Sequence, residues 1–199
     1  MAHGSNLIIG LDIGTTKIST VVAEIDRESR SLRVIGIGHA ASQGLRKGVV
    51  VDMEKAVGAI TRSVEDAEKM ANVEIHSVFA GITGGHVKSF NSRGVAAVGE
   101  GGEIVQKDVD RAVAAARAVS LPADREILHT IPQEFTVDGQ AGIKEPAGMS
   151  GVRLEAEAHI ITGTITAAQN IIKAINKAGF EVEDIVLGSL ASSIAVLSE

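Results

Sequence analysis

The residues best suited to chemistry in this chain form one short run, Asp-Ile-Gly-Thr-Thr-Lys, from Asp12 to Lys17. In a tight turn, Gly14 allows a close approach and successive backbone N–H groups can point at an anion. Thr15 and Thr16 add hydroxyl donors, and Lys17 can reach a terminal phosphate as a point charge. Asp12 can hold Mg²⁺ through water, because this cation gives up its water ligands reluctantly. The run therefore predicts a triphosphate–metal corner.

The same run also fits an ordinary hairpin turn, because Gly and Asp are common in turns and Thr suits the flanking strands. It lacks the spacing of a P-loop and of a dinucleotide fingerprint. Two other glycine-rich stretches, 81–86 and 99–102, are interpreted as turns at element boundaries. The serines of residues 189–193 lack a Gly-x-Ser-x-Gly elbow, and the six histidines show no helical metal-binding spacing. No catalytic constellation is expected.

Composition excludes several function classes. The 199 residues are 45% hydrophobic and 22% charged, which is typical of a globular protein. Four Phe, no Trp, no Tyr and a net charge of -6 argue against nucleic-acid binding, which uses aromatic platforms and basic patches. The absence of Cys excludes disulfides and thiolate metal sites. Residues 1–6 are interpreted as a tag or a disordered start, and without a signal peptide or spanning run a cytoplasmic location is expected.

Apolar periodicity predicts the elements that would position the Asp12–Lys17 run. Two buried strands, 7–11 and 18–25, would form a hairpin around it. Asp52 is a plausible N-cap for a helix over 53–71. Thr166 to Gln169 matches a capping box that would begin a second helix, ending before Gly179. The other elements expected in this part of the chain are strands at 32–37, 73–82 and 181–187 and a short helix at 189–197.

Between these segments the sequence is richer in glycine, and we interpret it as a small α+β insert. Short strands are expected at 87–90 and 95–98, and a helix from Asp108 that stops before Pro122. A strand at 127–137 should lie at an edge or carry a bulge, because Pro132 lacks an amide donor. Residues 152–161 alternate, which predicts a strand with one buried and one solvent-facing side. The apolar side holds Val152, Leu154, Ala156, Ala158 and Ile160, and the polar side holds Arg153, Glu155, Glu157 and His159.

The Asp12–Lys17 corner resembles the first phosphate loop of the actin-like ATPase superfamily, which includes sugar kinases, heat-shock chaperones and MreB. Residues 45–52, 131–155 and 190–197 are similar to segments of the FtsA family of bacterial cell-division proteins, and the similarity runs in order from residue 7 to 199. The resemblance implies half of an actin-like (ribonuclease H-like) α/β fold with a mixed sheet. Residues 7–84 and 164–199 would be a nucleotide-binding subdomain, and residues 85–163 the FtsA-type insert.

By this resemblance Asp12, Gly14, Thr15, Thr16 and Lys17 would bind the phosphates of ATP, with Asp12 near Mg²⁺. The insert would contact other FtsA subunits and later division proteins. The family tethers FtsZ filaments to the inner face of the cell membrane at the division site. Its second phosphate loop, FtsZ-binding subdomain and membrane helix are expected after residue 199. We therefore expect at most weak ATPase activity in a full-length protein and none in this truncated chain.

Two alternatives share the first loop. A phosphotransferase of the sugar-kinase branch would need a catalytic Asp facing a substrate hydroxyl, and no isolated candidate is visible. The second alternative is the pilus-assembly protein PilM, a related actin homologue that differs from the FtsA family mainly in its cellular context. The Gly-Met-Ser-Gly segment at 148–151 favours the FtsA family.

Overall fold

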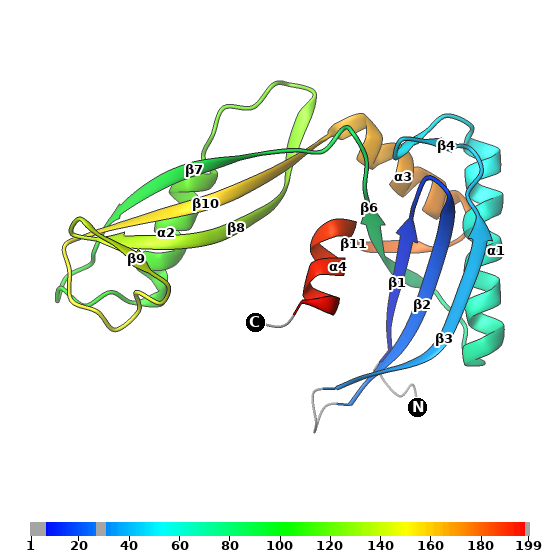
Figure 1. Ribbon diagram of the computed structural model, residues 1–199, viewed down its shortest axis with the longest axis horizontal. Coiled ribbons are helices and arrows are strands. Elements are labelled where there is room, and N and C mark those ends of the chain that lie inside the picture. The colour runs from blue at the N-terminus through cyan, green and yellow to red at the C-terminus, as the bar shows by residue number, and fades with distance from the viewer. Residues whose placement is uncertain (1–6, 27–30, 198–199) are drawn as a thin grey trace. The chain divides into compact units, whose positions relative to one another are not determined.

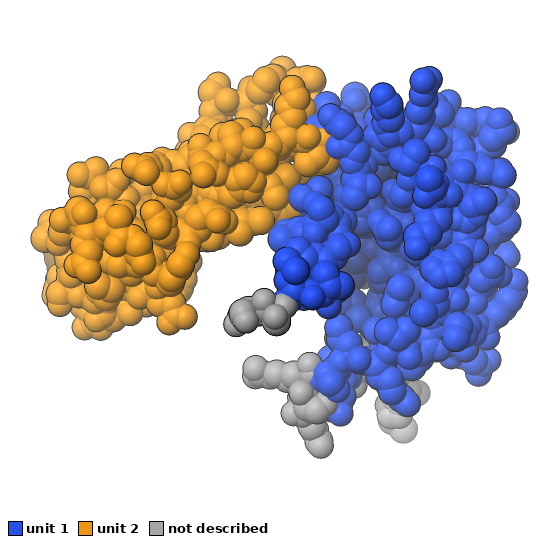
Figure 2. All heavy atoms as spheres, in the orientation of Figure 1, with its two compact units in different colours: residues 1–86, 164–199 blue, residues 87–163 orange. Residues whose placement is uncertain are grey.

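The computed structural model describes residues 7–26 and 31–197 of the chain. The chain divides into two compact units, shown in different colours in Figure 2. Unit 1 comprises residues 1–86 and 164–199, and unit 2 comprises residues 87–163. The tag or disordered start expected at residues 1–6 lies outside the described residues. Each unit has its own sheet and is described by itself.

Unit 1 is built on a five-stranded mixed sheet in the order β11-β6-β1-β2-β3 (Figure 1). The strands are β1 (Leu7–Ile13), β2 (Lys17–Ile25), β3 (Leu32–Ala41), β6 (Ser77–Ile82) and β11 (Glu181–Leu187). The first three are antiparallel neighbours, whereas β6 runs parallel to β1 and β11 runs parallel to β6. The mixed sheet predicted from the order of elements is therefore confirmed.

Helices α1 (Met53–Ala71) and α3 (Ile165–Lys177) pack against each other and against this sheet, and α4 (Gly188–Val196) contacts β11 and β6. A small hairpin of β4 (Leu45–Arg46) and β5 (Val49–Val50) precedes α1. The predicted N-cap of α1 is confirmed, since the Asp52 carboxylate accepts a hydrogen bond from the Lys55 amide at 3.1 Å.

Three glycine- and alanine-lined contacts bring α1 unusually close to β3. A Cβ on Gly38 would lie 1.9 Å from the Ser63 carbonyl oxygen and 2.6 Å from the Ala67 nitrogen. A Cβ on Gly36 would lie 2.6 Å from the Ala71 Cβ. The buried Ser63 hydroxyl lies 2.8 Å from the Thr20 hydroxyl and donates to the Gly38 carbonyl at 3.2 Å. Helix and sheet therefore meet backbone to backbone, with their buried hydroxyls satisfied.

Unit 2 holds a four-stranded sheet in the order β7-β10-β8-β9, with helix α2 (Gln106–Arg117) against it. Its strands are β7 (Lys88–Ala97), β8 (Arg125–Val137), β9 (Gln140–Ile143) and β10 (Arg153–Thr164). The core of this unit joins the helix to the sheet through apolar side chains, among them Val109, Ala112, Phe135 and Leu154. On β10 the expected alternation holds from Leu154 to Ile160, with the polar residues accessible.

Several boundaries predicted in unit 2 were wrong. Two short strands were expected at 87–90 and 95–98, but residues 88–97 form the single strand β7, because its polar middle stays paired with β10 in an unbroken register. Helix α2 begins at Gln106, and Asp108 lies inside its first turn, where it accepts from the Val105 amide at 3.1 Å. Val152 precedes β10 and is 75% exposed, so it is not part of the buried side.

Two predictions in unit 1 also fail for local reasons. The strand expected from Val73 begins only at Ser77, because the Val73 and Ile75 amides bond back to Glu68 at the end of α1. The capping box expected at Thr166 is absent. Strand β10 continues to Thr164 and α3 starts at the next residue, so Thr166 already lies within the helix.

We expect Gly38→Ala to lower the free energy of unfolding of unit 1 by about 1–3 kcal/mol, because its methyl group would collide with the backbone of α1. Urea unfolding would measure the change. Gly10→Ala is the matched control, since a Cβ at that strand position meets no heavy atom within 4 Å. Equal effects of the two substitutions would contradict the close contact.

Candidate functional site

The β1–β2 hairpin brings together all five residues predicted to form the phosphate corner. Gly14 donates its amide to the Lys17 carbonyl at 3.1 Å, and a Cβ on Gly14 would lie only 2.8 Å from that oxygen. The turn therefore needs glycine at this position. Because the Gly14 amide is used inside the turn, it is not available to an anion. The side chains of Thr15, Thr16 and Lys17 remain exposed.

Asp12 lies one residue before the end of β1, in the middle of a row of small neighbours. Across the sheet it pairs with Ser19 of β2 on one side and with Gly81 of β6 on the other. A Cβ on Gly81 would lie 3.3 Å from Asp12 Oδ1, and one on Gly188 would lie 3.5 Å from it. The carboxylate is therefore placed over glycine backbone at the start of α4.

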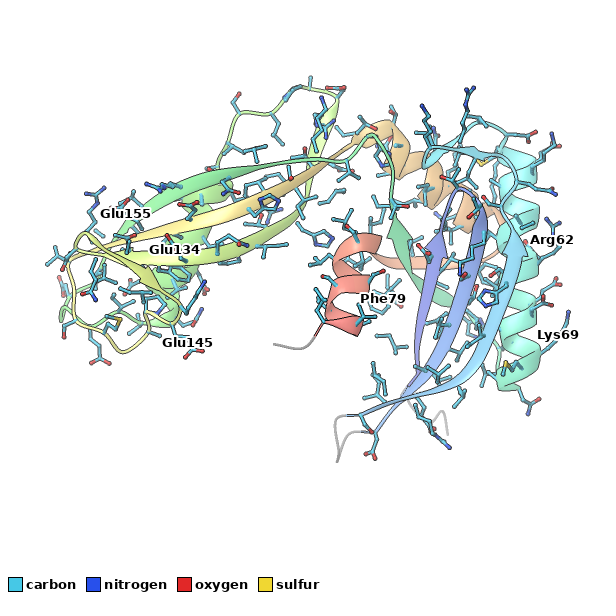
Figure 3. The ribbon with its side chains drawn as sticks, in the orientation of Figure 1. Arg62, Lys69, Phe79, Glu134, Glu145 and Glu155 are labelled. Carbon is cyan, nitrogen blue, oxygen red and sulfur yellow. The ribbon has the colours of Figure 1, made fainter. Side chains whose placement is uncertain are left out.

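A cavity of about 280 Å³ opens beside this carboxylate. It lies on the sheet face opposite to the one whose side chains, such as Leu11 and Ile13 of β1, are buried in the core. Its walls are mostly apolar, with Val21, Phe79 and Val186 from three different strands and Ala191 and Ser192 from α4. Phe79 projects from β6 beside α4 (Figure 3). Asp12 and the hydroxyls of Ser19 and Ser192 are thus the polar side chains of an otherwise apolar wall.

Burial against these walls raises the pKa of Asp12 above its ordinary value of 3.8, and the smaller attraction of Lys17 lowers it. The residue as a whole is exposed, so the carboxylate is only partly removed from water. The ammonium of Lys17 forms no ion pair with Asp12 among the described residues. A partly desolvated carboxylate with an unshared cation nearby is a common feature of binding sites.

The surroundings limit how a metal could be held. Ser19 is engaged with His39, whose Nδ1 lies 3.1 Å from the serine hydroxyl oxygen. Within residues 7–26 and 31–197, no group of three or more His, Cys, Asp or Glu side chains is placed to bind a metal ion. A cation here would depend on Asp12, water and the anion it accompanies. In the same part of the chain, no helix is long and apolar enough to cross a bilayer.

Sequence reasoning missed the walls of the site. Gly81 stood where the strand expected at 73–82 overlaps the turn expected at 81–86; it lies inside β6 and provides the space beside Asp12. Phe79, Val186 and Ser192 carried no signal of their own, since they reach the cavity only through strand pairing and the position of α4. The one available signal was a glycine within a strand-like run, which often marks a close approach.

Comparison with known proteins shows which protein family this chain resembles. A family profile described as "SHS2 domain inserted in FTSA" matches residues 84–162. Cell division protein FtsA of Borreliella burgdorferi is 50% identical over 195 residues, which cover 98% of this chain and 47% of that protein. FtsA of Pseudomonas aeruginosa is 47% identical over 197 residues, covering 99% of this chain and 47% of that protein. The chain therefore spans about half the length of the curated relatives it matches.

A solved structure titled "PilM-PilN type IV pilus biogenesis complex" matches with a TM-score of 0.63 at 14% sequence identity. The match covers 94% of this chain and 49% of that chain. At this identity the likeness shows the fold alone. Together with the mixed sheet and the inserted domain, it confirms the expected half of an actin-like fold.

The raised pKa of Asp12 has a testable consequence for stability. The folded chain binds this proton more tightly than the unfolded chain, so the free energy of unfolding falls as pH rises from 3.8 through the raised pKa. We expect Asp12→Asn to raise the urea midpoint at pH 7 and to leave it unchanged at pH 3, because the wild-type carboxyl is then protonated. Glu181→Gln, at an exposed position of β11, is the control. A lower midpoint for Asp12→Asn at pH 7 would contradict the burial argument.

Proposed function

Because the chain corresponds along its whole length to part of cell division protein FtsA, as its sequence resemblance indicated, we propose that it acts in bacterial cell division. In this proposal unit 1 supplies one wall of a nucleotide site and unit 2 supplies an interaction surface. The observation that carries the first part is the hairpin that presents two threonines and a lysine next to a partly buried carboxylate.

We assign the phosphates of ATP to Thr15, Thr16 and Lys17, with Gly14 closing the turn and Asp12 holding Mg²⁺ through water. The residues fit this role, because the hydroxyls and the ammonium are exposed and Asp12 has no competing ion pair among the described residues. Bound nucleotide would supply the triphosphate charge, and the hairpin would orient it. Residues 7–84 with 164–199 are proposed as the nucleotide-binding subdomain, without hydrolytic activity of their own.

Residues 85–163 are proposed to contact other FtsA subunits and later division proteins. We attribute FtsZ binding, and contact with the inner face of the membrane at the division site, to other parts of a full-length protein. The accessible side of β10 supports an interaction role, because its charged residues are paired in a defined pattern. Arg93 and Glu157 lie 2.9 Å apart across β7 and β10, and Arg153 and Glu155 lie 3.2 Å apart.

The phosphotransferase and pilus-assembly alternatives are weaker. The likeness to the PilM-PilN structure is at 14% identity, whereas curated FtsA proteins reach 50% over nearly the whole chain. A protein of the sugar-kinase branch would also need a second carboxylate beside the phosphate corner. Among the residues that line the described cavity, Asp12 is the only acidic one.

The proposal is tested by a chimera in which this chain replaces the matching portion of Pseudomonas aeruginosa FtsA, to which it is 47% identical. In cells depleted of their own FtsA, we expect the chimera to restore division and normal cell length, because both units would supply the replaced functions. The measurement is cell length and colony formation, with immunoblotting to verify the level of the chimera. Filamentous cells that contain normal amounts of a folded chimera would overturn the proposal.

The same chimera tests the phosphate corner. We expect Lys17→Met to weaken ATP binding roughly 10- to 100-fold in calorimetry, since a hydrogen bond to a charged group contributes about 1.5–3 kcal/mol. Lys173→Met removes an exposed lysine of α3 and is the matched control. If both variants bind ATP equally well, Lys17 has no role in phosphate binding.

A further inference from the structure

Strand β7 lies at the border of the unit 2 sheet. It pairs with β10 along its whole length, and no strand of the described chain lies on its other side. Figure 1 shows β7 at this side of the sheet, next to β10. With ten residues, β7 is long for a strand. A long open edge presents backbone N–H and C=O groups that another strand can pair with.

The hydrogen bonds at the end of β7 show which of its backbone groups face the open side. The Val98 amide, just after the strand, donates to the Val152 carbonyl at 2.8 Å. Because these directions alternate in an antiparallel ladder, even-numbered residues of β7 face β10 and odd-numbered residues face outward. The Ala97 carbonyl agrees, since it accepts from Arg111 of α2 at 2.7 Å. Within the described chain, the residues whose backbone groups remain open are Ser89, Asn91, Arg93 and Val95.

Helix α2 covers only one half of this strand. It reaches β7 at Ala97 through Arg111, and at Gly94, where an added Cβ would lie 2.0 Å from the Ala116 nitrogen. Ala116 is the last residue but one of the helix. The helix therefore runs from the end of β7 toward its middle and leaves the first half of the strand without this cover. Phe90 lies in that half and is 39% exposed.

The polar side chains beside the open edge are already engaged within unit 2. Arg93 donates from Nε to the Glu157 carboxylate of β10 at 3.0 Å, and the Asn91 amide donates to the same carboxylate at 3.3 Å. His159 Nδ1 lies 2.7 Å from Asn91 Oδ1. Edge strands commonly avoid pairing by exposing charge. Because Glu157 neutralises Arg93, this charge does not prevent a second strand from approaching.

We propose that a second copy of this chain pairs with this edge, so that two β7 strands run antiparallel and the two sheets become continuous. The two-fold axis passes between the Ser92 residues of the two copies. In this register Asn91 pairs with Arg93 of the other copy. Ser89 pairs with Val95 of the other copy, so every open residue has a backbone partner. The inference rests on the interaction role proposed for unit 2 and names the strand and register of one contact.

Other registers of the two strands are less favourable. A slide of one residue sets the open groups of one copy opposite residues whose groups face β10, so no ladder forms. A slide of two residues in one direction places the two Arg93 side chains opposite each other, and like charges in this position are destabilising. A slide of two residues in the other direction places Val95 opposite Val87, which precedes the strand.

The half-covered strand also makes the two copies fit sterically. The two-fold axis sets the covered half of one β7 beside the uncovered half of the other, so the two α2 helices do not occupy the same space. Phe90 comes opposite Gly94 of the other copy, and an aromatic side chain compensates for a strand glycine in this position. Its ring lies beside Ala115, which is exposed on the same flank of α2 as Arg111.

The register can be tested by cross-linking, because the chain contains no cysteine. The two Ser92 residues form a pair without mutual hydrogen bonds, with Cα atoms about 4.5 Å apart, which a disulfide can span. We expect Ser92→Cys to give a disulfide-linked dimer on mild oxidation with glutathione disulfide, measured by non-reducing electrophoresis.

Ser89→Cys is the matched control on the same strand. In the proposed register the two Ser89 Cα atoms lie about 20 Å apart, the length of six strand residues. We therefore expect its cross-linking to be at least about tenfold slower, although Ser89 is exposed and Ser92 is half-buried. Random collisions would favour the exposed position. Equal rates, or a faster reaction at position 89, would overturn the proposal.

Sedimentation equilibrium measures the association without a covalent bond. We expect reversible dimers, weakened about tenfold by Ala115→Gln, because the longer side chain takes the space of the Phe90 ring. Ala114→Gln is the control, since Ala114 is also exposed but lines the cavity between α2 and β8. Equal effects of the two substitutions would place the contact elsewhere. A chain that stays monomeric would leave the edge to a segment of a different protein and would overturn the proposal.

These outcomes are independent of the division assay. A chimera that restores division, while Ser92→Cys gives no cross-linked dimer, would overturn only this inference and leave the proposed function standing. A cross-linked dimer together with a folded chimera that fails to restore division would have the opposite meaning. The strand contact would then stand, and the role in division would not.

Discussion

The close contact between α1 and the glycines of β3 fixes the position of everything else in unit 1. Because Gly36 and Gly38 let the helix backbone rest on the strand, one face of the sheet is committed to the helical layer. Side chains alternate between the two faces of a strand. Leu11 and Ile13 therefore point into the face covered by the helices, and Asp12 points to the opposite face. A register slip of one residue would bury the carboxylate and expose the core. The functional face is therefore defined by the packing of the opposite one.

Unit 2 also contains a close contact between a helix and a strand glycine. Gly94 lets α2 approach β7 backbone to backbone, as Gly38 does for α1 and β3. The buried cluster beneath α2 also includes Phe135 and Val137 of β8. Strand β9 is short and pairs with β8 at Phe135 and Val137. In both units a glycine lets a helix rest on the backbone of a strand, and this contact determines which sheet face the helix covers.

The features that the sequence predicted well are those determined locally. The β1–β2 hairpin, the Asp52 cap of α1 and the alternation of β10 depend on neighbouring residues. The continuous strand β7, in contrast, is held by its ladder with β10, which no local pattern reveals. The candidate site divides in the same way. Its five hairpin residues are consecutive or nearly so, whereas Gly81, Val186 and Ser192 reach Asp12 only through long-range pairing and the placement of α4.

The electrostatics of the hairpin support a ligand that carries both signs of charge. Asp12 and Lys17 lie at the two ends of one turn, yet they form no ion pair among the described residues. Burial disfavours the charged form of Asp12, and the distant lysine only partly offsets this. A simple anion would bind Lys17 but repel the carboxylate, and a bare cation would do the reverse. A hydrated divalent cation bound to a phosphate presents the opposite charge to each group, so it stabilises both at once. Under the proposed function, Asp12 and Lys17 do not pair with each other. Asp12 instead faces the hydrated cation, and Lys17 faces the phosphate.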